Sequence, residues 1–532
     1  MTMDPQEQQA PSADGFPADD VWRRLSTRML LIHPVKELIR FLPALIAVVI
    51  AGSTGGQKWW GLIGVAIAVG LGLLRWLTTR YRFTPDQVQL RHGLLNTTTV
   101  SAPIDRVRSV DVTASILHRA LGLAEVKIGT GAGEKELKLD GLTAAEAAAL
   151  RGDLLHRSRA QAAGGSAARG TVSNADAADQ PDPAGRQPPS YSPETVVYQL
   201  NPSWIRYAPF SPAGLIAALA IFGIGSQVIN ESGIDWGDNG VVNGAADFAR
   251  GLGVLAAIVV GLLALVVFVV LLSLGGYLLA FHNFRLTRDD AGGTHHVTRG
   301  LLTTRATSLE IRRLRGVALH RPVPLRWVGG ARLEAITTGV KDDDRTMSTT
   351  LTPPSPAPVV TATATRVLGD PHALEQPLQP HGPAATRRRY TRALVGFGIP
   401  AAALVAAATV WSLPALVIPA VLLLVLGVLL GRSRARWLGH AITDRFLITR
   451  SGSLALATDV VERRSAVGVV VRRSFFQRRA RLATVSLATA AGAKAYPVID
   501  VPQQQVGELA GQLLPETAEQ FLRDQPPTTH SA

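Results

Sequence analysis

The longest uncharged stretch of the sequence places the strongest constraint on the fold. It runs from Ala393 to Gly431, 39 residues without Asp, Glu, Lys or Arg. A straight helix of that length would measure about 58 Å, roughly twice the hydrocarbon thickness of a membrane. The run Trp411-Ser412-Leu413-Pro414 interrupts it, and proline lacks the amide donor that a continuing helix needs. The stretch therefore predicts two membrane-spanning helices joined by a tight turn.

Two further pairs of apolar segments precede this one. The first pair covers Phe41–Gly56 and Trp59–Leu77, and the second covers Tyr207–Gln227 and a segment within Gly251–Phe281. About 20 mostly apolar residues suffice to cross the hydrocarbon core as a helix. The sequence therefore predicts six spans in three hairpins.

Basic residues indicate the orientation of these hairpins. They flank the ends of each pair away from its turn, whereas the loop between the third and fourth spans carries Glu231, Asp235, Asp238 and Asp247. Because Lys and Arg near span ends favour the cytoplasmic side, we expect a multi-pass protein of the cytoplasmic membrane with both termini and both large loops inside. The flanking residues include Arg40, Arg75, Arg206, Arg285, Arg387 and Arg432.

Charge and cysteine content exclude several function classes. The chain has 532 residues, a formal net charge of +14 and no Cys, which excludes disulfides, thiol nucleophiles and Cys-based zinc sites. The charge alone would fit nucleic acid, anionic lipid or an acidic partner. Because many of the arginines flank the predicted spans, we expect no nucleic-acid partner. The polar first forty residues contain no signal-peptide pattern, so the first apolar segment is expected to remain as an anchor.

The segment after each hairpin follows one pattern, which indicates an internal repeat. A short strand leads through a glycine turn to a second strand and then to an arginine-bearing element. Short β-branched runs divided by turn residues predict antiparallel strands. The first repeat then closes with a helix opened by a Thr143–Glu146 capping box, and in the third repeat Asp500 and Gln503 bracket the start of a helix. The middle repeat has a weaker counterpart near Val359 to Leu368. The glycine turns are Gly93-Leu94-Leu95, Gly300-Leu301-Leu302 and Gly452-Ser453-Leu454.

The run YRFTPDQVQLRHGLLNTTTVSAPIDRVRSVDV, from Tyr81, resembles the bacterial PH-like membrane proteins (bPH2, formerly DUF304), here in a multi-repeat form. The second repeat departs from the pattern by an insertion at Asp289–His295, and the third has no match for Gly122 and carries Arg479 in that neighbourhood. The resemblance implies an α+β membrane protein with three transmembrane helical hairpins. Each hairpin would be followed by a PH-like β-sandwich or barrel capped by a C-terminal helix. It implies a fold and a location more than an activity.

The expected domain organisation follows from the hairpins, the repeats and two stretches poor in large apolar residues, which we interpret as flexible linkers. It comprises a cytoplasmic N-terminal segment (1–37), hairpin 1 (38–77), PH-like domain 1 (78–157), a linker (158–200), hairpin 2 (201–281), PH-like domain 2 (282–369), a linker (370–386), hairpin 3 (387–431), PH-like domain 3 (432–515) and a tail (516–532).

The candidate binding residues are the arginines that recur at one place in each repeat. They could engage anionic headgroups, which is worth about 1 kcal/mol per residue close to a membrane surface. The alternative is that they form the exposed face of a strand whose apolar residues are buried, and this structural interpretation is favoured. The residues are Arg106, Arg108, Arg312, Arg313, Arg315, Arg463 and Arg464.

No set of side chains indicates catalysis, a cofactor or a metal. His295 and His296 follow a glycine-rich run and are expected on a surface loop, because further ligands at metal-site spacing are missing. The run Asp342-Asp343-Asp344 lacks the alternating ligands of a calcium loop and is expected to be a solvated turn. We therefore expect no catalytic residue, no cofactor and no metal.

The sequence favours a non-enzymatic membrane protein whose tandem PH-like domains act as a scaffold or binding module at the inner membrane surface. The expected partners are membrane lipids, including anionic headgroups, and a protein partner or a second copy of the chain. The alternative is a component of a transport, export, envelope-stress or antimicrobial-resistance system. Transport pathways usually contain ionisable residues within the membrane, and the apolar segments have almost none.

Overall fold

The structure is a computed structural model, and it describes residues 22–29, 32, 70, 77–84, 86–93, 97–104, 107, 109–129, 137–154, 194–210, 223, 253–290, 293–338 and 349–514. The chain divides into two compact units. Unit 1 comprises Met1–Thr195 and Leu215–Glu310, and unit 2 comprises Val196–Gly214 and Ile311–Ala532.

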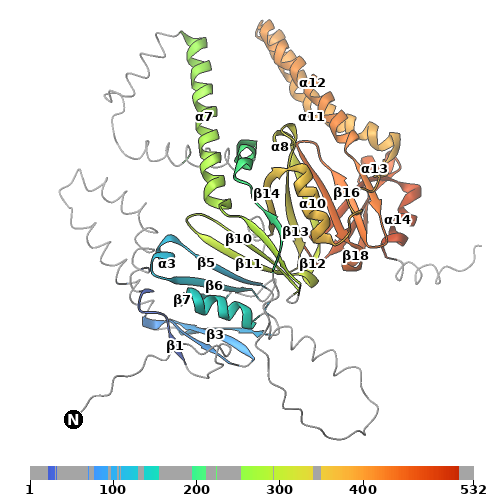
Figure 1. The fold of residues 1–532 in the computed structure, drawn as a ribbon. Helices are drawn as coiled ribbons and strands as arrows, with labels where there is room; N and C mark the ends of the chain where they lie inside the picture. The colour runs from blue at the N-terminus through green and yellow to red at the C-terminus, as the bar shows by residue number, and fades with distance from the viewer. Residues whose placement is uncertain are drawn as a thin grey trace, which may run out of the picture. The chain divides into compact units, whose positions relative to one another are not determined.

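Unit 1 contains an antiparallel β-sandwich closed by one helix (Figure 1). Side chains from both sheets and from the helix over residues 144–154 share one core that includes Tyr81, Val88, Val126 and Leu150. The predicted capping box opens this helix, because the Thr143 amide donates to Glu146 Oε2 at 2.8 Å. The first sheet has the order β1-β2-β3-β4, with strands Arg23–Arg24, Arg80–Phe83, Gln87–His92 and Thr98–Pro103.

The second sheet of unit 1 joins strands from two repeats. Six of its strands follow the order β7-β6-β5-β11-β10-β9, so β5 of the first repeat lies beside β11 of the second. A short helix, α3 (Ile116–Ala120), follows β5, and the long helix α7 (Val254–Phe281) precedes β9. The strands are Ser109–Ala114 (β5), Leu123–Gly129 (β6), Leu137–Thr143 (β7), Arg285–Asp289 (β9), Thr294–Arg299 (β10) and Thr304–Glu310 (β11).

Unit 2 repeats this construction one step along the chain. Its larger sheet has the order β14-β13-β12-β17-β16-β15, which joins the end of the second repeat to the start of the third. One face of this sheet packs on the sheet β18-β19-β20, in a core that includes Leu447, Val461, Val485 and Val498. The strands are Leu314–Pro322 (β12), Gly330–Thr337 (β13), Thr350–Pro356 (β14), Gly439–Ile442 (β15), Phe446–Ser451 (β16), Ala455–Glu462 (β17), Ala466–Arg472 (β18), Leu482–Thr489 (β19) and Ala495–Pro502 (β20).

Shorter elements complete unit 2. Helix α10 (Ala357–Leu368) closes the second repeat and contributes buried Val360, Ala364 and Val367. The remaining elements are β8 (Thr195–Gln199) and η2 (Pro202–Phe210), η4 (Ile311–Arg313), α8 (Val323–Trp327), η7 (Arg463–Ser465), α13 (Phe475–Arg479), η8 (Gln503–Gln505) and α14 (Val506–Leu513).

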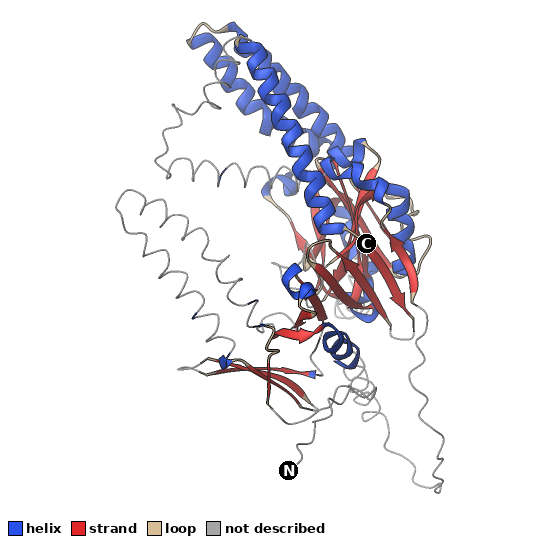
Figure 2. Ribbon diagram, turned by 60° about the vertical axis from the view of Figure 1, so that its left-hand side comes forward, coloured by secondary structure: helices blue, strands red, loops and turns tan. Residues whose placement is uncertain are grey.

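Three helices in the described part of the chain are long and apolar enough to span a membrane: Ala256–Phe281, Gly382–Val410 and Pro414–Arg436. The last two form a hairpin of α11 (Gly382–Val410) and α12 (Val417–Arg436), with η6 (Pro414–Leu416) at the turn (Figure 2). The turn lies where the sequence places it, and Ser412 adopts a φ of 52° there. Glycines allow close packing, because a Cβ on Gly431 would lie 2.9 Å from Tyr390.

The other predicted spans mostly lie outside the described residues. The segments at residues 41–56 and 59–77 are described only at residues 70 and 77. The start of the third, Tyr207–Phe210, belongs to the 3₁₀ helix η2, in which Tyr207 is buried. The structure is thus a mixed α/β membrane protein with antiparallel sheets and three described candidate spans.

Candidate functional site

Five of the seven predicted arginines belong to the described residues, and they lie in or close to the 3₁₀ turns that join the two halves of a repeat. Arg106 and Arg108 are outside the described residues. Arg312 and Arg313 are in η4, Arg315 is in β12, and Arg463 and Arg464 are in η7.

This end of unit 2 is remote from the base of its membrane hairpin. The other end of β17 adjoins that base, because Arg434 of α12 donates to Ser453 at 3.4 Å. The eight residues of β17 place Arg463, which follows this strand, about 26 Å from the end that adjoins the base of the hairpin. Gly316 lies opposite Val461, so Arg312, Arg313 and Arg315 share the remote end. At physiological salt, charges are screened beyond about 8 Å, which disfavours headgroup contact there.

Arg463 has local bonding partners at this end. Its Nη1 donates to the Thr443 carbonyl at 3.0 Å, and its Nη2 donates to the Gln512 carbonyl in the last turn of α14. These contacts satisfy carbonyls of a turn and a helix end, which favours a structural role. Arg312 and Arg464 are exposed.

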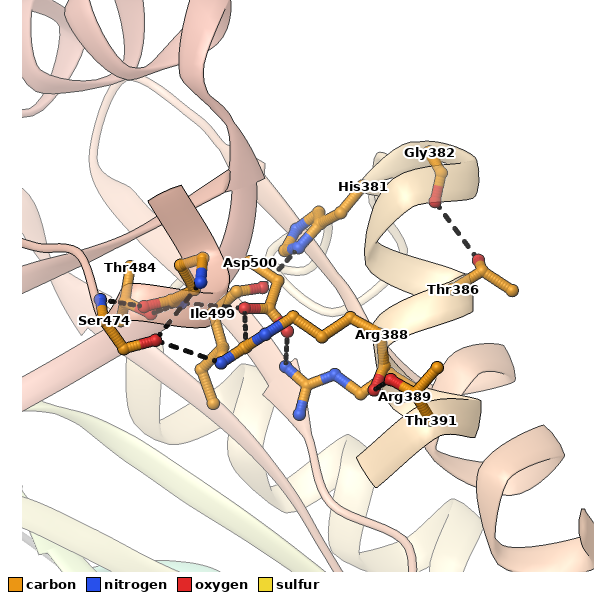
Figure 3. Close-up of polar contacts among 11 residues, drawn as sticks. His381, Gly382, Thr386, Arg388, Arg389, Thr391, Ser474, Thr484, Ile499 and Asp500 are labelled. Carbon is orange, nitrogen blue, oxygen red and sulfur yellow. Dashed lines mark hydrogen bonds and ion pairs between the residues drawn. The ribbon is translucent and has the colours of Figure 1, made fainter. Parts of the chain in front are cut away.

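A buried carboxylate connects the membrane hairpin to the third repeat (Figure 3). Asp500 of β20 is fully buried, and both Arg388 and Arg389 of α11 point toward it. Arg389 Nη2 lies 2.8 Å from Asp500 Oδ2, and Arg388 Nη1 donates to Oδ1. Gln477 Nε2 also donates to Oδ1 at 2.8 Å. This cluster ties the base of α11 to the β-domain that follows the hairpin.

Local backbone chemistry positions this cluster. Asp500 adopts a φ of 62° at a bulge where β20 shifts register against β19, and Asp tolerates this left-handed region better than most residues. Ser474 and Gln477 form a capping box that starts α13 and holds the Gln477 amide in place. The sequence placed Asp500 at the start of the final helix, but its side chain bonds α11 instead. The sequence signal for this buried role was the position of a single acidic residue between apolar strand residues.

Two histidines lie beside the carboxylate. His381 Nε2 is 2.8 Å from His440 Nδ1, and His381 Nδ1 is 2.7 Å from the Ile499 carbonyl. Burial lowers the pKa of His381, and burial followed by the neighbouring His381 lowers the pKa of His440 to about 4. Both rings are therefore neutral at neutral pH. Residues 370–386 were expected to be a flexible linker, yet they include buried Ala373, His381 and Ala385.

The first repeat carries a related arrangement. His118 of α3 stands where Gln477 stands in α13, and its Nε2 lies 2.9 Å from Asp140 Oδ1. The residue that corresponds to Asp500 is Gly141, at the bulge between β6 and β7, with a φ of 94°. Here Met29 packs on the glycine, because a Cβ added to Gly141 would meet Met29 Cγ at 3.3 Å.

A basic cluster surrounds Trp437 at the base of α12. The guanidinium carbons of Arg450, Arg326 and Arg436 lie 5.1, 5.4 and 5.7 Å from the Trp437 ring centroid. Burial and the charge of Arg321 lower the pKa of both Arg326 and Arg450. Within the described part of the chain, Arg321 Nε and Arg326 Nη1 are buried without a hydrogen-bond partner. Buried donors and concentrated positive charge favour an anion.

The equivalent place in unit 1 contains a cavity of about 300 Å³ at the base of α7. Arg119, Arg299 and Arg305 line it, together with His282. Arg119 occupies the same position in α3 as Arg326 does in α8, four residues after the N-cap. Burial first, then the charge of Arg305, lowers the pKa of Arg299 to about 10. Basic groups therefore recur beside the span in both units.

The predicted surface loop at His295 and His296 is wrong. Both residues lie in β10 and are buried. His296 Nδ1 lies 3.0 Å from Ser308 Oγ, and burial lowers the pKa of His295 to about 4. Strand pairing with β9 and β11 overrides the turn signal of the preceding glycines. The run Asp342-Asp343-Asp344 lies outside the described residues, and the described residues hold no group of three potential metal ligands.

Comparison with known proteins confirms the family resemblance. The model of the bacterial PH domain family matches residues 36–158 and 396–517. These regions cover the first and third repeats with most of the hairpins predicted to precede them. The chain is therefore a membrane protein that carries bacterial PH domains.

One curated relative is similar to a large part of the chain. The UPF0699 transmembrane protein YdbT of Bacillus subtilis (strain 168) is 19% identical over 325 residues, 59% of this chain and 61% of that protein. The match thus spans less than two thirds of the relative's length. No solved structure matches the chain significantly.

Proposed function

We propose that this protein is a non-enzymatic binding module and scaffold of the cytoplasmic membrane. Its PH-like domains would bind anionic lipid headgroups beside the spans, at the inner surface. The observation that carries this proposal is the basic cluster formed by Arg321, Arg326, Arg436 and Arg450 around Trp437. Its buried donors need an acceptor that the described residues do not supply.

The position of the cluster fits headgroup binding. Trp437 follows α12, six residues beyond Gly431, where the uncharged stretch ends. Six helical residues rise about 9 Å, slightly more than the roughly 5–8 Å thickness of one headgroup layer, so Trp437 lies at its outer part. Tryptophan and arginine are both favoured at this level, where the ring remains partly apolar and the guanidinium reaches phosphate.

The ion pairs at Asp500 support the scaffold part of the proposal. They hold the third repeat against the base of its hairpin. The basic cluster around Trp437 therefore keeps a fixed orientation relative to α11 and α12. In contrast, a transport role has no supporting feature in the described spans. Helix α7 contains no Asp, Glu, Lys, Arg or His from Val254 to Phe281.

Native mass spectrometry of the full chain, purified in a neutral detergent and titrated with phosphatidylglycerol, tests the headgroup proposal. We expect Arg321→Gln with Arg326→Gln to retain one anionic lipid fewer and to bind it roughly thirtyfold more weakly, because each arginine contributes about 1 kcal/mol. Phosphatidylcholine should bind both proteins equally. Glycerol 3-phosphate should displace the lipid if the site recognises phosphate alone.

The matched control is Arg312→Gln with Arg464→Gln, which removes the same charge at the remote end of unit 2. We expect lipid retention to remain at the unsubstituted level. A loss of binding in this control, with none in the Arg321 and Arg326 variant, would transfer the headgroup site to the remote arginines.

A further inference from the structure

One strand in each repeat occupies the same structural position. It follows the turn between the two halves of the repeat and leads into a short helix: β5 before α3, β12 before α8 and β18 before α13. Registers with the next strand confirm the equivalence. Thr113 lies opposite Glu125, His320 opposite Arg332, and Arg472 opposite Thr484, each two residues after the start of that next strand.

In the first two repeats this strand pairs with the following repeat. The outer edge of β5 binds β11, with Val112 opposite Ala306. The outer edge of β12 binds β17, with Leu319 opposite Thr458. Both pairings are antiparallel, and both use the strand that follows the glycine turn. The chain thus uses one type of strand junction twice.

In the third repeat, the corresponding strand β18 has one neighbour, β19, among the described strands. Its side chains are unusually open for an apolar strand: Val467, Val470 and Val471 are 78, 48 and 43% exposed. Unpaired apolar edges of this kind are templates for strand addition.

The first repeat presents the complementary edge. Its strand after the glycine turn is β4, which corresponds to β11 and β17. β4 ends its sheet, with β3 as its one partner among the described strands. The described strands therefore include one strand of each type with an open edge.

We propose that β18 of one copy pairs with β4 of a second copy, in the antiparallel junction already used twice within the chain. Val471 takes the place of Val112 and Leu319, and Thr99 takes the place of Ala306 and Thr458. Val471 therefore lies opposite Thr99 of the next copy. Because the two surfaces differ, the contact is head-to-tail, and it generates a ring or a filament in the membrane plane.

This assembly specifies the partner of the proposed scaffold and does not depend on lipid binding. A second copy is favoured over an unrelated partner because the missing strand must match β11 and β17 in position, and β4 does so. The chain gains backbone hydrogen bonds along the open edge and covers the exposed valines.

Disulfide cross-linking tests the proposed register, because the chain contains no Cys. Two differently tagged full-length chains are co-expressed, one with Thr99→Cys and the other with Val471→Cys, and membranes are mildly oxidised. Opposed residues bring their Cβ atoms to about 4.5–5.5 Å, close enough for a disulfide after small movements. We expect a mixed dimer that carries both tags. Both sites are solvent-exposed, so the substitutions should leave the thermal melt unchanged.

The matched control combines Ser101→Cys with Val471→Cys, which lies two residues out of register on the same face of the strand. We expect at least a fivefold lower yield of mixed dimer. Equal yields from the two pairs, or no cross-link in either, would overturn the proposal. A Val471→Cys homodimer as the main product would indicate symmetric pairing of two β18 edges and would also overturn it.

Discussion

The first and third repeats each hold an earlier segment of the chain against the same point of the β-domain, yet they use opposite chemistry. At the bulge of its last strand, the first repeat has Gly141, and Met29 packs on it. The third repeat has Asp500, which binds Arg388 and Arg389. Both residues have positive φ angles, 94° and 62°.

The comparison shows that backbone geometry is retained while the side-chain chemistry changes. The left-handed bulge turns the backbone toward the incoming segment in both repeats. Glycine offers space for an apolar side chain, whereas aspartate offers a charge that two arginines neutralise. Methionine requires only burial, but the ionic contact requires all of its members, because an unpaired buried charge costs several kcal/mol.

The largest predicted effect is therefore at Asp500. Asp500→Ala leaves Arg388 and Arg389 buried without a counter-charge and should destabilise unit 2 by about 3–5 kcal/mol. Thermal unfolding of the full chain in neutral detergent measures this loss. Asp444→Asn, at an exposed turn of the same unit, should remain within about 0.5 kcal/mol of the unsubstituted protein.

A triple substitution sharpens the comparison. Asp500→Gly with Arg388→Leu and Arg389→Met imitates the first repeat and should recover most of the lost stability, since apolar replacements of buried ion pairs are often neutral. If Asp500→Ala alone melts as the unsubstituted protein does, the ion pairs do not hold the hairpin.

A smaller effect is expected at Gly141. Gly141→Val forces a β-branched residue to a φ of 94° and places its Cβ against Met29, which should cost about 1–3 kcal/mol. The same thermal unfolding assay measures it. Gly152→Ala is the control, because this helical glycine has no atom within 4 Å of an added Cβ. It should stabilise the protein by about 0.5–1 kcal/mol. Equal melting of both variants would contradict the packing of Met29.

Much of the fold follows from the sequence, because the signals are local. Pro414, with an uncharged apolar stretch on each side, predicts the turn between α11 and α12. Thr143 with Glu146 predicts the start of a helix. The junctions β5–β11 and β12–β17 could not be predicted, because strand neighbours from different repeats leave no local pattern.

The candidate site was predicted less well for a related reason. The predicted arginines are adjacent to one another in the sequence, whereas Arg321, Arg326 and Arg450 come together only in the folded chain. Likewise, Asp500 and Arg388 are 112 residues apart. Charged residues that are distant in the sequence and meet only through tertiary contacts leave no recognisable pattern in a single sequence.

The central claim is that the repeats and their basic clusters lie at the cytoplasmic face of the membrane. Single cysteines in this Cys-free chain test it most directly, with an impermeant thiol reagent applied to intact cells. Cysteine introduced at Asn239, between the third and fourth predicted spans, should react. Cysteine introduced at Asn174 or Ser348 should react only after the cells are opened. Labelling of Asn174→Cys or Ser348→Cys in intact cells would contradict the orientation and, with it, the contact of these clusters with the inner leaflet.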